Sequence, residues 1–484
     1  MHIPETIHLS RWLLMLLIFL YFVIDIAAVV VVLKENRNPI RALAWIIALL
    51  FLPMVGLIFY LFFGRSMRGE MMSHQNKRRL MNNRISLSMK LKDIPLSSES
   101  KNLITLGEKL SGYPYTNNNQ IEIFIDGAEK FKSLKKDLQE AKKSILLQYY
   151  IFLDDRIGKE VADILMTKAR EGVEVKVIYD HVGSFSASNS FFKKMKEAGV
   201  EIHPFFRVNF PQFANRINWR NHRKIVVIDS EIGYIGGMNI ADRYAYEPTA
   251  EGKGGQRWRD THFRVKGDIL ESLIYSFIID WNFQKNDTYL PELKREKERE
   301  LNSTGIQLVT DGPIGHWNNL SLMFLKAISS AKRLIWIQTP YFLPTDALFN
   351  ALQAAALAHV DVRIMMPENT DSILLHYASF SYVTQCLEAG IKVYLYQPGM
   401  LHAKAMVIDD SLVTAGSTNF DFRSFENNFE CNLFIHDSTI NRKMRDIFYN
   451  DMKSCIKIKK EEWRRRPLGQ RFLESLLRPI SPIL

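Results

Sequence analysis

"NHRKIVVIDSEIGYIGGMNI" forms residues 221–240 of the chain, and a related stretch, "LHAKAMVIDDSLVTAGSTNF", forms residues 401–420. In both stretches His-x-Lys is followed, at one spacing, by Asp and then by Gly-x-x-Asn. A single copy would be weak evidence, because short patterns recur by chance. Two copies in the same register indicate an internal duplication.

Each copy is predicted to form a β-strand. "HRKIVVID" is rich in strand-forming residues, so successive side chains should point to opposite faces of a sheet. His222 and Lys224 then lie side by side, whereas Asp229 points the other way and is expected to hold local structure at the strand end. The second copy repeats this arrangement with His402, Lys404 and Asp409.

The repeat extends upstream of the two motifs. The matched stretches are 141–152 with 331–342, 172–180 with 359–367, and 197–205 with 388–396. Short β-branched runs alternate with helical stretches, which predicts a duplicated α/β fold with mixed, largely buried sheets. We expect a first lobe at residues 120–286, a charged connector at 287–305 and a second lobe at 306–454.

The N-terminal region, residues 1–63, contains two apolar segments. Residues 12–33 and 42–63 are each long enough to cross a bilayer, and Asp25 is their one charged residue. They predict a two-helix transmembrane hairpin; a cleaved signal peptide and a buried core helix are the alternatives. Asp25 should face protein or an interface, since a charge in hydrocarbon is costly.

Basic residues favour a cytoplasmic position for the rest of the chain. Residues 64–119 are polar and basic, and they predict a juxtamembrane linker over anionic headgroups or a solvated tether. Residues 455–484 form a basic tail, either a surface-binding helix or a helix packed on the body. Its apolar side carries Trp463, Phe472, Leu473, Leu476 and Leu477.

Overall composition narrows the class of partner. The net charge of +11 suggests an anionic partner, which could be nucleic acid, acidic lipid or a phosphorylated small molecule. The chain has three cysteines without CxxC spacing, which argues against a disulfide framework or a cysteine zinc site.

The paired motifs are suited to phosphodiester chemistry. Lysines together with the amides of Asn239 and Asn419 would hold the negative oxygens of a phosphodiester and of its pentacoordinate transition state. One imidazole can attack phosphorus while the other protonates the departing alkoxide. The two histidines could instead bind a metal, but a lysine beside each would repel a cation, so we expect no metal and no cofactor.

The paired pattern resembles the HKD motif of the phospholipase D superfamily, and the resemblance runs from about Ile121 to the end of the chain. It implies a pseudo-twofold α/β fold with one active site between the lobes and a phosphohistidine intermediate. It favours His222 as the nucleophile and His402 as the acid and base, although near-symmetry leaves the roles exchangeable. It also implies that a carboxylate downstream of each motif orients that motif's histidine. The candidates are Asp260 and Glu430.

The copies differ at one supporting position, where Ser417 of the second matches Gly237 of the first. The whole layout is similar to that of bacterial cardiolipin synthases. The matching stretches are the hairpin ending "YLFFGR", "TDGP", "QTPYFLP", "FDFRSFENNFE" and the C-terminal tail.

This resemblance implies transfer of a phosphatidyl group between two phosphatidylglycerols, giving cardiolipin and glycerol. The expected partners are phosphatidylglycerol, cardiolipin and an anionic membrane surface, in a multi-pass protein of the bacterial inner (cytoplasmic) membrane. A phospholipase D or another phosphatidyltransferase is the alternative. A nuclease fits poorly with a membrane hairpin, so no nucleic-acid partner is expected, and a scaffold with a decayed site fits poorly with two complete motifs.

Overall fold

The structure is a computed structural model that describes residues 5–35, 39–60, 96–208, 218–246, 258–285, 289 and 304–483. It divides into two units, each considered by itself: an N-terminal helical unit (Met1–Met71 with Arg207–Asn218) and an α/β body (Met72–Phe206 with Trp219–Leu484).

The helical unit differs from the predicted hairpin in its second segment. Helix α1 (Glu5–Glu35) contains the apolar stretch Arg11–Lys34, the one helix in the described part of the chain that is long enough to cross a membrane. The second segment is divided into α2 (Pro39–Phe51) and α3 (Pro53–Phe59). Proline lacks the N–H that continues a helix, and Leu52 before it leaves helical geometry at φ −128° and ψ 62°. The predicted second continuous span is therefore not confirmed, and its residues 61–63 lie outside the described ranges.

Helices α1, α2 and α3 contact one another within this unit. Their small apolar cluster consists of Ala28, Val32, Ala42, Leu49 and Tyr60. Gly56 allows the close approach of α3 to α2, because a Cβ there would lie 2.5 Å from the carbonyl oxygen of Ala48. The side chain of Asp25 is 6% exposed, in agreement with the expectation that this charge is shielded.

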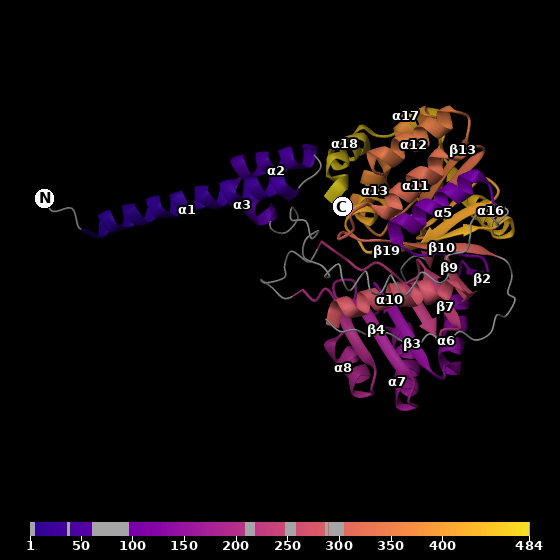
Figure 1. Cartoon of the computed structure of the whole chain (residues 1–484). Coiled ribbons are helices and arrows are strands. Elements are labelled where there is room, and N and C mark those ends of the chain that lie inside the picture. The colour runs from indigo at the N-terminus through magenta and orange to yellow at the C-terminus, as the bar shows by residue number, and fades with distance from the viewer. Residues whose placement is uncertain are drawn as a thin grey trace. The chain divides into compact units, whose positions relative to one another are not determined.

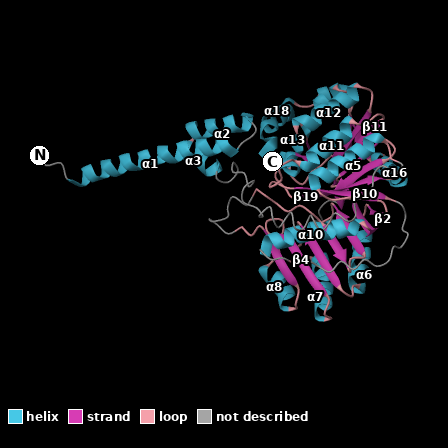
Figure 2. Cartoon of the chain, in the orientation of Figure 1, coloured by secondary structure: helices cyan, strands magenta, loops and turns pink. Residues whose placement is uncertain are grey.

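The first lobe of the body is a seven-stranded mixed sheet with strand order β2-β9-β7-β6-β3-β4-β5. The strands are β2 (Asn119–Phe124), β3 (Ser144–Tyr149), β4 (Glu174–Asp180), β5 (Glu201–Phe205), β6 (Ile225–Ile228), β7 (Ile232–Gly236) and β9 (His262–Gly267). Helices α6 (Gly127–Glu140), α7 (Arg156–Arg170) and α8 (Asn189–Glu197) cover one face, and α10 (Ile269–Lys285) covers the other (Figures 1 and 2).

The second lobe is a nine-stranded sheet with order β1-β10-β19-β17-β16-β11-β13-β14-β20. Its seven central strands repeat the order of the first sheet. They are β10 (Gly305–Asp311), β19 (Glu430–His436), β17 (Leu412–Gly416), β16 (Ala405–Ile408), β11 (Leu334–Gln338), β13 (Asp361–Pro367) and β14 (Lys392–Tyr396). The covering helices include α11 (Asn319–Ser329), α12 (Asp346–Leu357), α13 (Ile373–Phe380), α14 (Val383–Glu388) and α16 (Ser438–Met452) (Figure 1). The predicted duplication is confirmed, and the first motif before β6 has its counterpart before β16.

The first edge strand of the second sheet comes from the predicted linker. Helix α5 (Ser98–Ser111) and β1 (Tyr115–Thr116) belong to the body, and β1 pairs antiparallel with β10. The buried amide of Gln307 donates to the carbonyls of Ile104 and Tyr113 at 3.1 and 3.2 Å, which fixes this segment on the second lobe. A linker can therefore extend only to about residue 97, and residues 61–95 lie outside the described ranges.

The C-terminal tail packs on the second lobe. It forms β20 (Cys455–Lys457), α17 (Lys460–Arg464), α18 (Leu468–Leu477) and a final turn of 3₁₀ helix, Arg478–Ile483. Trp463 and Leu477 are buried in the core of this lobe, whereas Phe472 and Leu476 are 66% and 57% exposed. The lobe thus extends well beyond its predicted end at residue 454. Of the predicted connector at 287–305, most residues lie outside the described ranges.

Candidate active site

The two motifs meet at one cavity of about 290 Å³ between the lobes. His222 and His402 line it from opposite lobes, each just before its strand, together with Asn239 and Asn419. The prediction that each copy supplies half of a single site is therefore supported by the geometry. Further lining residues are Tyr150, Arg220, Arg243, Tyr244, Trp258, Tyr341, Asp371, Leu375, Asp421, Arg423 and Asn428.

Backbone pairing across the lobes positions both histidines. The N–H of His222 donates to the carbonyl of Phe429 at 2.9 Å, and the N–H of His402 donates to the carbonyl of Arg259 at 2.7 Å. On the second side this contact belongs to a short parallel pair, β15 (Met400–Leu401) with β8 (Trp258–Arg259). Each histidine segment is thus held against the residue that precedes the carboxylate of the opposite lobe.

The carboxylates consequently pair with the histidines in a crossed manner. Nδ1 of His222 lies 3.0 Å from Oε1 of Glu430, and Nδ1 of His402 lies 2.6 Å from Oδ2 of Asp260. The expectation that each carboxylate orients the histidine of its own motif was wrong. The pseudo-twofold packing of the lobes brings each carboxylate to the other motif instead.

The ionisation of these groups fixes the role of each ring nitrogen. Asp260 and Glu430 are fully buried, which raises their pKa, but nearby lysine and histidine outweigh burial and leave both pKa values below the ordinary range. An ionised carboxylate only accepts hydrogen bonds, so Nδ1–H of each imidazole donates to it. Nε2 of His222 is left for reaction with a substrate, whereas Nζ of Lys404 lies 2.6 Å from Nδ1 and 3.1 Å from Nε2 of His402.

The motif lysines are buried beside the histidines. Nζ of Lys224 donates to the carbonyl of His222 at 2.6 Å, and Nζ of Lys404 donates to the carbonyl of His402. Burial lowers the pKa of Lys224 to about 7 and that of Lys404 to about 8. Burial and the lysine charges of both lobes lower the pKa of His402 to about 3, and burial is the main cause of a lowered pKa for His222.

The asparagines lie where the motif predicts but already have protein partners. Nδ2 of Asn239 donates to Oη of Tyr244 at 2.9 Å, and Nδ2 of Asn419 donates to Oδ2 of Asp421 at 2.9 Å. A side-chain amide has two N–H hydrogens, so each can still donate one hydrogen bond to a phosphoryl oxygen.

Gly237 and Ser417 differ because each lies beside a different carboxylate, Asp260 in the first case and Glu430 in the second. Oγ of Ser417 donates to Glu430 and accepts from the N–H of Cys431 at 2.9 Å, which orients the glutamate. A Cβ on Gly237 would lie 2.2 Å from Oδ1 of Asp260. The aspartate therefore occupies the space that the serine side chain fills in the other half.

The motif aspartates hold structure, as predicted. Asp229 accepts hydrogen bonds from the N–H groups of Lys142, Lys143 and Ser144 at 2.8, 2.7 and 2.8 Å. Asp409 makes the equivalent bonds to residues 332–334 in the second lobe. Both aspartates point away from the imidazoles and anchor the start of the neighbouring strand.

Asp229→Asn should destabilise the body without removing a reacting group. Hydrogen bonds to charged groups contribute roughly 1.5–3 kcal/mol each, so we expect a loss of about 2–3 kcal/mol when one acceptor oxygen becomes an NH₂ group. Asparagine tolerates the positive φ of 52° at this position, so backbone strain does not confound the comparison. Thermal unfolding in detergent tests this; an unchanged midpoint would contradict the structural role.

Comparison with known proteins places these features in a family. A family model described as "Cardiolipin synthase, PLD-like domain" matches residues 134–250 and 324–452, one stretch in each lobe. The major cardiolipin synthase ClsA of Bacillus subtilis is 38% identical, over 97% of this chain and 99% of its own length. The chain belongs to the cardiolipin synthase family of phospholipase D-like proteins.

Other comparisons agree with this family. Cardiolipin synthase of Oceanobacillus iheyensis is 38% identical over 97% of this chain and 99% of that protein. A model described as "Phospholipase D-nuclease N-terminal" matches residues 23–65, across the apolar N-terminal region. The crystal structure of phosphatidylserine synthase from Haemophilus influenzae covers 79% of this chain and 100% of its own, with a TM-score of 0.60 and 16% identity, which shows the fold alone.

Aromatic and charged residues around the family motifs were not identified from the sequence. The ring centroid of Tyr150 lies 4.9 Å from that of His222, and the ring centroid of Trp258 lies 4.7 Å from that of His402. Arg220 forms an ion pair of 3.2 Å with Asp180, and both are buried. Proximity in sequence could have identified Arg220, two residues before His222, but nothing local marks Asp180 or Tyr150.

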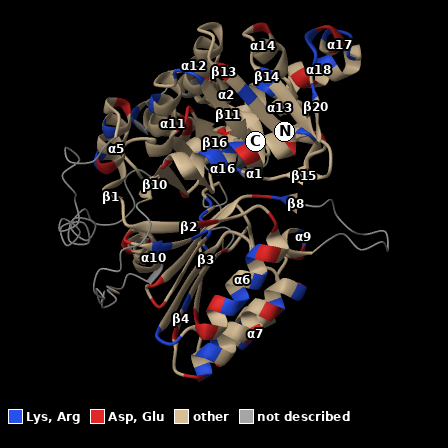
Figure 3. Ribbon diagram, turned by 90° about the vertical axis from the view of Figure 1, so that its right-hand side faces the viewer, with Lys and Arg blue, Asp and Glu red and all other residues tan. Residues whose placement is uncertain are grey.

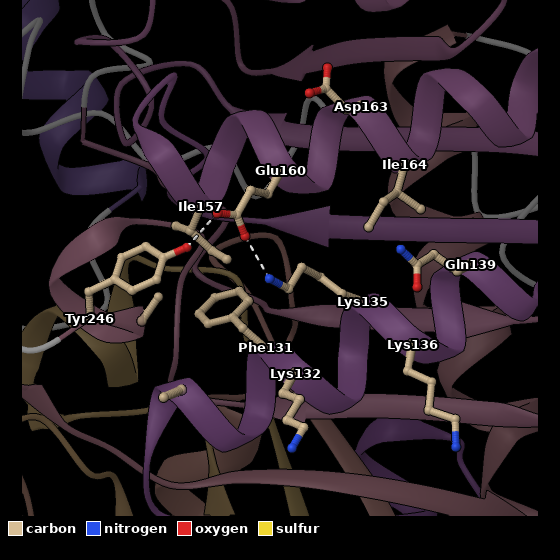
Figure 4. Close-up of a pocket in the computed structure, with 12 residues that line it drawn as sticks. Phe131, Lys132, Lys135, Lys136, Gln139, Ile157, Glu160, Asp163, Ile164 and Tyr246 are labelled. Atoms are coloured by element: carbon tan, nitrogen blue, oxygen red, sulfur yellow. Dashed lines mark hydrogen bonds and ion pairs between the residues drawn. The ribbon is translucent and has the colours of Figure 1, made fainter.

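A second cavity of about 500 Å³ lies on the first lobe between α6 and α7 (Figure 4). It contains none of the motif residues. Its central carboxylate, Glu160, accepts hydrogen bonds from Nζ of Lys135 at 2.6 Å and Oη of Tyr246 at 2.8 Å (Figure 4). Glu160, Lys135 and Tyr246 satisfy one another, and no histidine among the described residues lines this cavity, so the smaller cavity with both histidines is the better candidate for catalysis.

Proposed function

We propose that this chain transfers a phosphatidyl group from one phosphatidylglycerol to another, forming cardiolipin and glycerol through a phosphohistidine. The observation that carries the proposal is the cavity that both motif histidines line, each imidazole held by an ionised carboxylate of the opposite lobe and each histidine carbonyl bonded to a buried motif lysine. Relatives named cardiolipin synthase that align over nearly the whole chain support this choice of reaction.

In the first step, Nε2 of His222 attacks phosphorus while His402 donates a proton to the glycerol oxygen. The P–O bond breaks, a P–N bond forms and glycerol leaves. Glu430 stabilises the positive charge that develops on His222, because it accepts the hydrogen bond from Nδ1. The negative phosphodiester raises the pKa of His402 when it binds, which allows this imidazole to carry the proton it donates.

In the second step, a terminal hydroxyl of another phosphatidylglycerol attacks the same phosphorus. His402 takes the hydroxyl proton, the P–N bond breaks and cardiolipin forms. Lys224, Lys404 and the two motif asparagines stabilise the non-bridging oxygens in both transition states. The exchange of one phosphoester for another needs no oxidant and no nucleotide.

The charge state of the lysines predicts the alkaline pH dependence. An ammonium group binds a phosphoryl oxygen only below its pKa, so kcat/KM should fall as pH rises through about 7 to 8, where Lys224 and Lys404 lose their protons. An ordinary lysine would keep its charge to about pH 10. Initial rates at low phosphatidylglycerol concentration test this, and a flat profile up to about pH 10 would exclude the assigned lysine pKa values.

We also propose that residues 1–63 form a two-pass membrane anchor that leaves the body cytoplasmic. The long apolar helix α1 and the second apolar segment support this, as does the excess of basic residues after it. The topology is tested by introducing a cysteine into the body and comparing its labelling by a membrane-impermeant reagent in intact cells and in inverted membrane vesicles. Labelling of the body from outside intact cells would reject it.

An anionic membrane surface is the proposed partner of α18. Leu468, Phe472 and Leu476 are 78%, 66% and 57% exposed and recur every fourth residue, so they share one helix face. Helix α18 packs on α13, where Ile373 is 77% exposed and Leu375 lines the active-site cavity. Basic residues at the end of α17 and just after it, Arg464 to Arg466, precede α18 in the sequence, and blue ribbon marks basic residues of α17 in Figure 3. Replacing Phe472 with Ser should lower activity on bilayers but not on monomeric short-chain lipid; equal effects on both would refute this role.

The proposed reaction is tested by incubating the detergent-purified full chain with phosphatidylglycerol, followed by lipid mass spectrometry. Equal amounts of cardiolipin and glycerol are expected. Phosphatidic acid alone would indicate a phospholipase, and a product only with serine or ethanolamine lipid added would indicate another phosphatidyltransferase.

A further inference from the structure

Arg220 has unused hydrogen-bonding capacity inside the catalytic cavity. Its side chain is 2% exposed and lines the cavity, and Nη1 pairs with Oδ1 of Asp180 at 3.2 Å. Nε and Nη2 of the same guanidinium are buried without a hydrogen-bond partner. Buried donors without protein partners are costly, and at a cavity wall they are positioned to donate to the acceptors of a ligand.

Asp180 holds this guanidinium in place. It accepts hydrogen bonds from the N–H groups of Val182, Gly183 and Asn221 at 3.0, 2.9 and 2.9 Å. Because backbone groups fix the carboxylate, the arginine paired with it is pre-organised. Pre-organised donors bind an anion at a lower entropic cost than those of a free surface arginine.

A second arginine lines the same part of the cavity. Arg423 lies close enough for its charge to act on its neighbours: burial is the main cause of a lowered pKa for Arg220, and Arg423 lowers it further. Burial raises the pKa of Tyr150, and the charge of Arg423 opposes that rise. Tyr150 in turn packs edge-on against His222. The two guanidinium groups repel each other, and one negative group between them would remove that repulsion.

This arrangement exists in only one half of the site. Four residues after each motif asparagine stands an arginine, Arg243 in the first copy and Arg423 in the second. Arg220 has no such counterpart, since Met400 occupies its position in the second copy and Pro367 occupies the position of Asp180. Arg243 is exposed and lies over the ring of Trp258 at 4.8 Å. The reacting phosphate lies between the two matching His-x-Lys motifs. Arg220 and Arg423 together lie in only one half of the site, so they suit a substrate group that is also present in only one half.

We infer that Arg220 and Arg423 bind the phosphodiester of the accepting phosphatidylglycerol, beside the phosphorylated His222. The inference rests on the proposed function and names the subsite of its second substrate. The acceptor differs from water and from glycerol in having its own phosphodiester near the attacking hydroxyl. Held by the arginines, that hydroxyl attacks the phosphorus on His222, the P–N bond breaks and the proton passes to Nε2 of His402.

Two rates measured on the full chain in phosphatidylglycerol vesicles separate the acceptor subsite from the donor subsite. Exchange of deuterated glycerol into phosphatidylglycerol uses the donor site and an uncharged acceptor. Cardiolipin formation uses the charged acceptor. Arg423→Gln should lower cardiolipin formation by about tenfold more than it lowers glycerol exchange, the effect expected for loss of one charge-assisted hydrogen bond.

Arg220→Lys is the second variant, because it keeps a positive partner for buried Asp180 while removing the planar guanidinium. It should shift the ratio of the two rates in the same direction. Arg156→Gln is the matched control, since its side chain is 70% exposed and lies outside the cavity, and neither rate should change.

Equal loss of both rates would overturn the inference by assigning the arginines to the reacting phosphate. An unchanged ratio in both variants would also overturn it. Absence of cardiolipin from the unmodified chain would instead refute the proposed function itself, so the two failures are distinguishable.

Discussion

His222→Ala and His402→Ala should each lower cardiolipin formation by about 10⁴-fold or more, the upper end of what general acid–base catalysis supplies. Each variant removes one of the two Nε2 atoms that react, and the two imidazoles enter the cavity from different lobes. His359→Asn is the control, because His359 is exposed in the turn after α12 and asparagine tolerates its φ of 68°. Initial rates by lipid mass spectrometry provide the measurement.

The same variants distinguish the nucleophile from the acid. A phosphatidyl-nitrophenol donor has a leaving group that needs no protonation, so His402→Ala should still form the phosphoenzyme on His222 and then fail to release it. Intact-protein mass spectrometry should detect this adduct in His402→Ala and none in His222→Ala. The opposite pattern would reverse the two roles, and near-normal turnover by either variant would contradict a shared site.

The duplication and the joint site could be predicted because both depend on local pattern. Strand alternation predicts His222 beside Lys224 and Asp229 turned away. The strand β6 begins only at Ile225, and Asp229 follows it at φ 52°, so the three backbone hydrogen bonds to Asp229, rather than alternation, hold it away from the imidazole. The crossed pairing of Asp260 with His402 depends on how two lobes pack, and the spacing within one motif contains no information on it.

Two of the predicted segments near the N-terminus differ from the structure for different physical reasons. The apolar composition of residues 42–63 predicts one continuous helix. Pro53 interrupts that helix, and composition alone does not show such an interruption. The polar composition of residues 98–111 predicts a linker, whereas these residues form α5, in which Leu103 and Leu110 recur at helical spacing and pack on the second lobe. Its partners lie about 200 residues away, as with Ile104 and Gln307, so only the folded lobe shows why it is ordered.

Asp260→Asn should lower cardiolipin formation by about 10²-fold or more, since an imidazole loses the anion that stabilises its protonated form. Asp260 also raises the pKa of Lys404 against the larger effect of burial, which leaves it at about 8. Removing that negative charge lowers the lysine pKa, so the alkaline decline of kcat/KM should move to lower pH. Asp163→Asn is the control, because Asp163 is exposed on α7 and lies outside the catalytic cavity.

The crossed geometry makes this prediction specific to one step. Asp260 contacts His402, the proposed acid and base, so Asp260→Asn should retain a rapid nitrophenol burst and slow the transfer that follows. Glu430→Gln should slow the burst itself, because Glu430 contacts the nucleophile His222. Pairing within each motif predicts the reverse assignment. A slow burst in Asp260→Asn together with a normal burst in Glu430→Gln would therefore refute the crossed arrangement while leaving the two-step reaction intact.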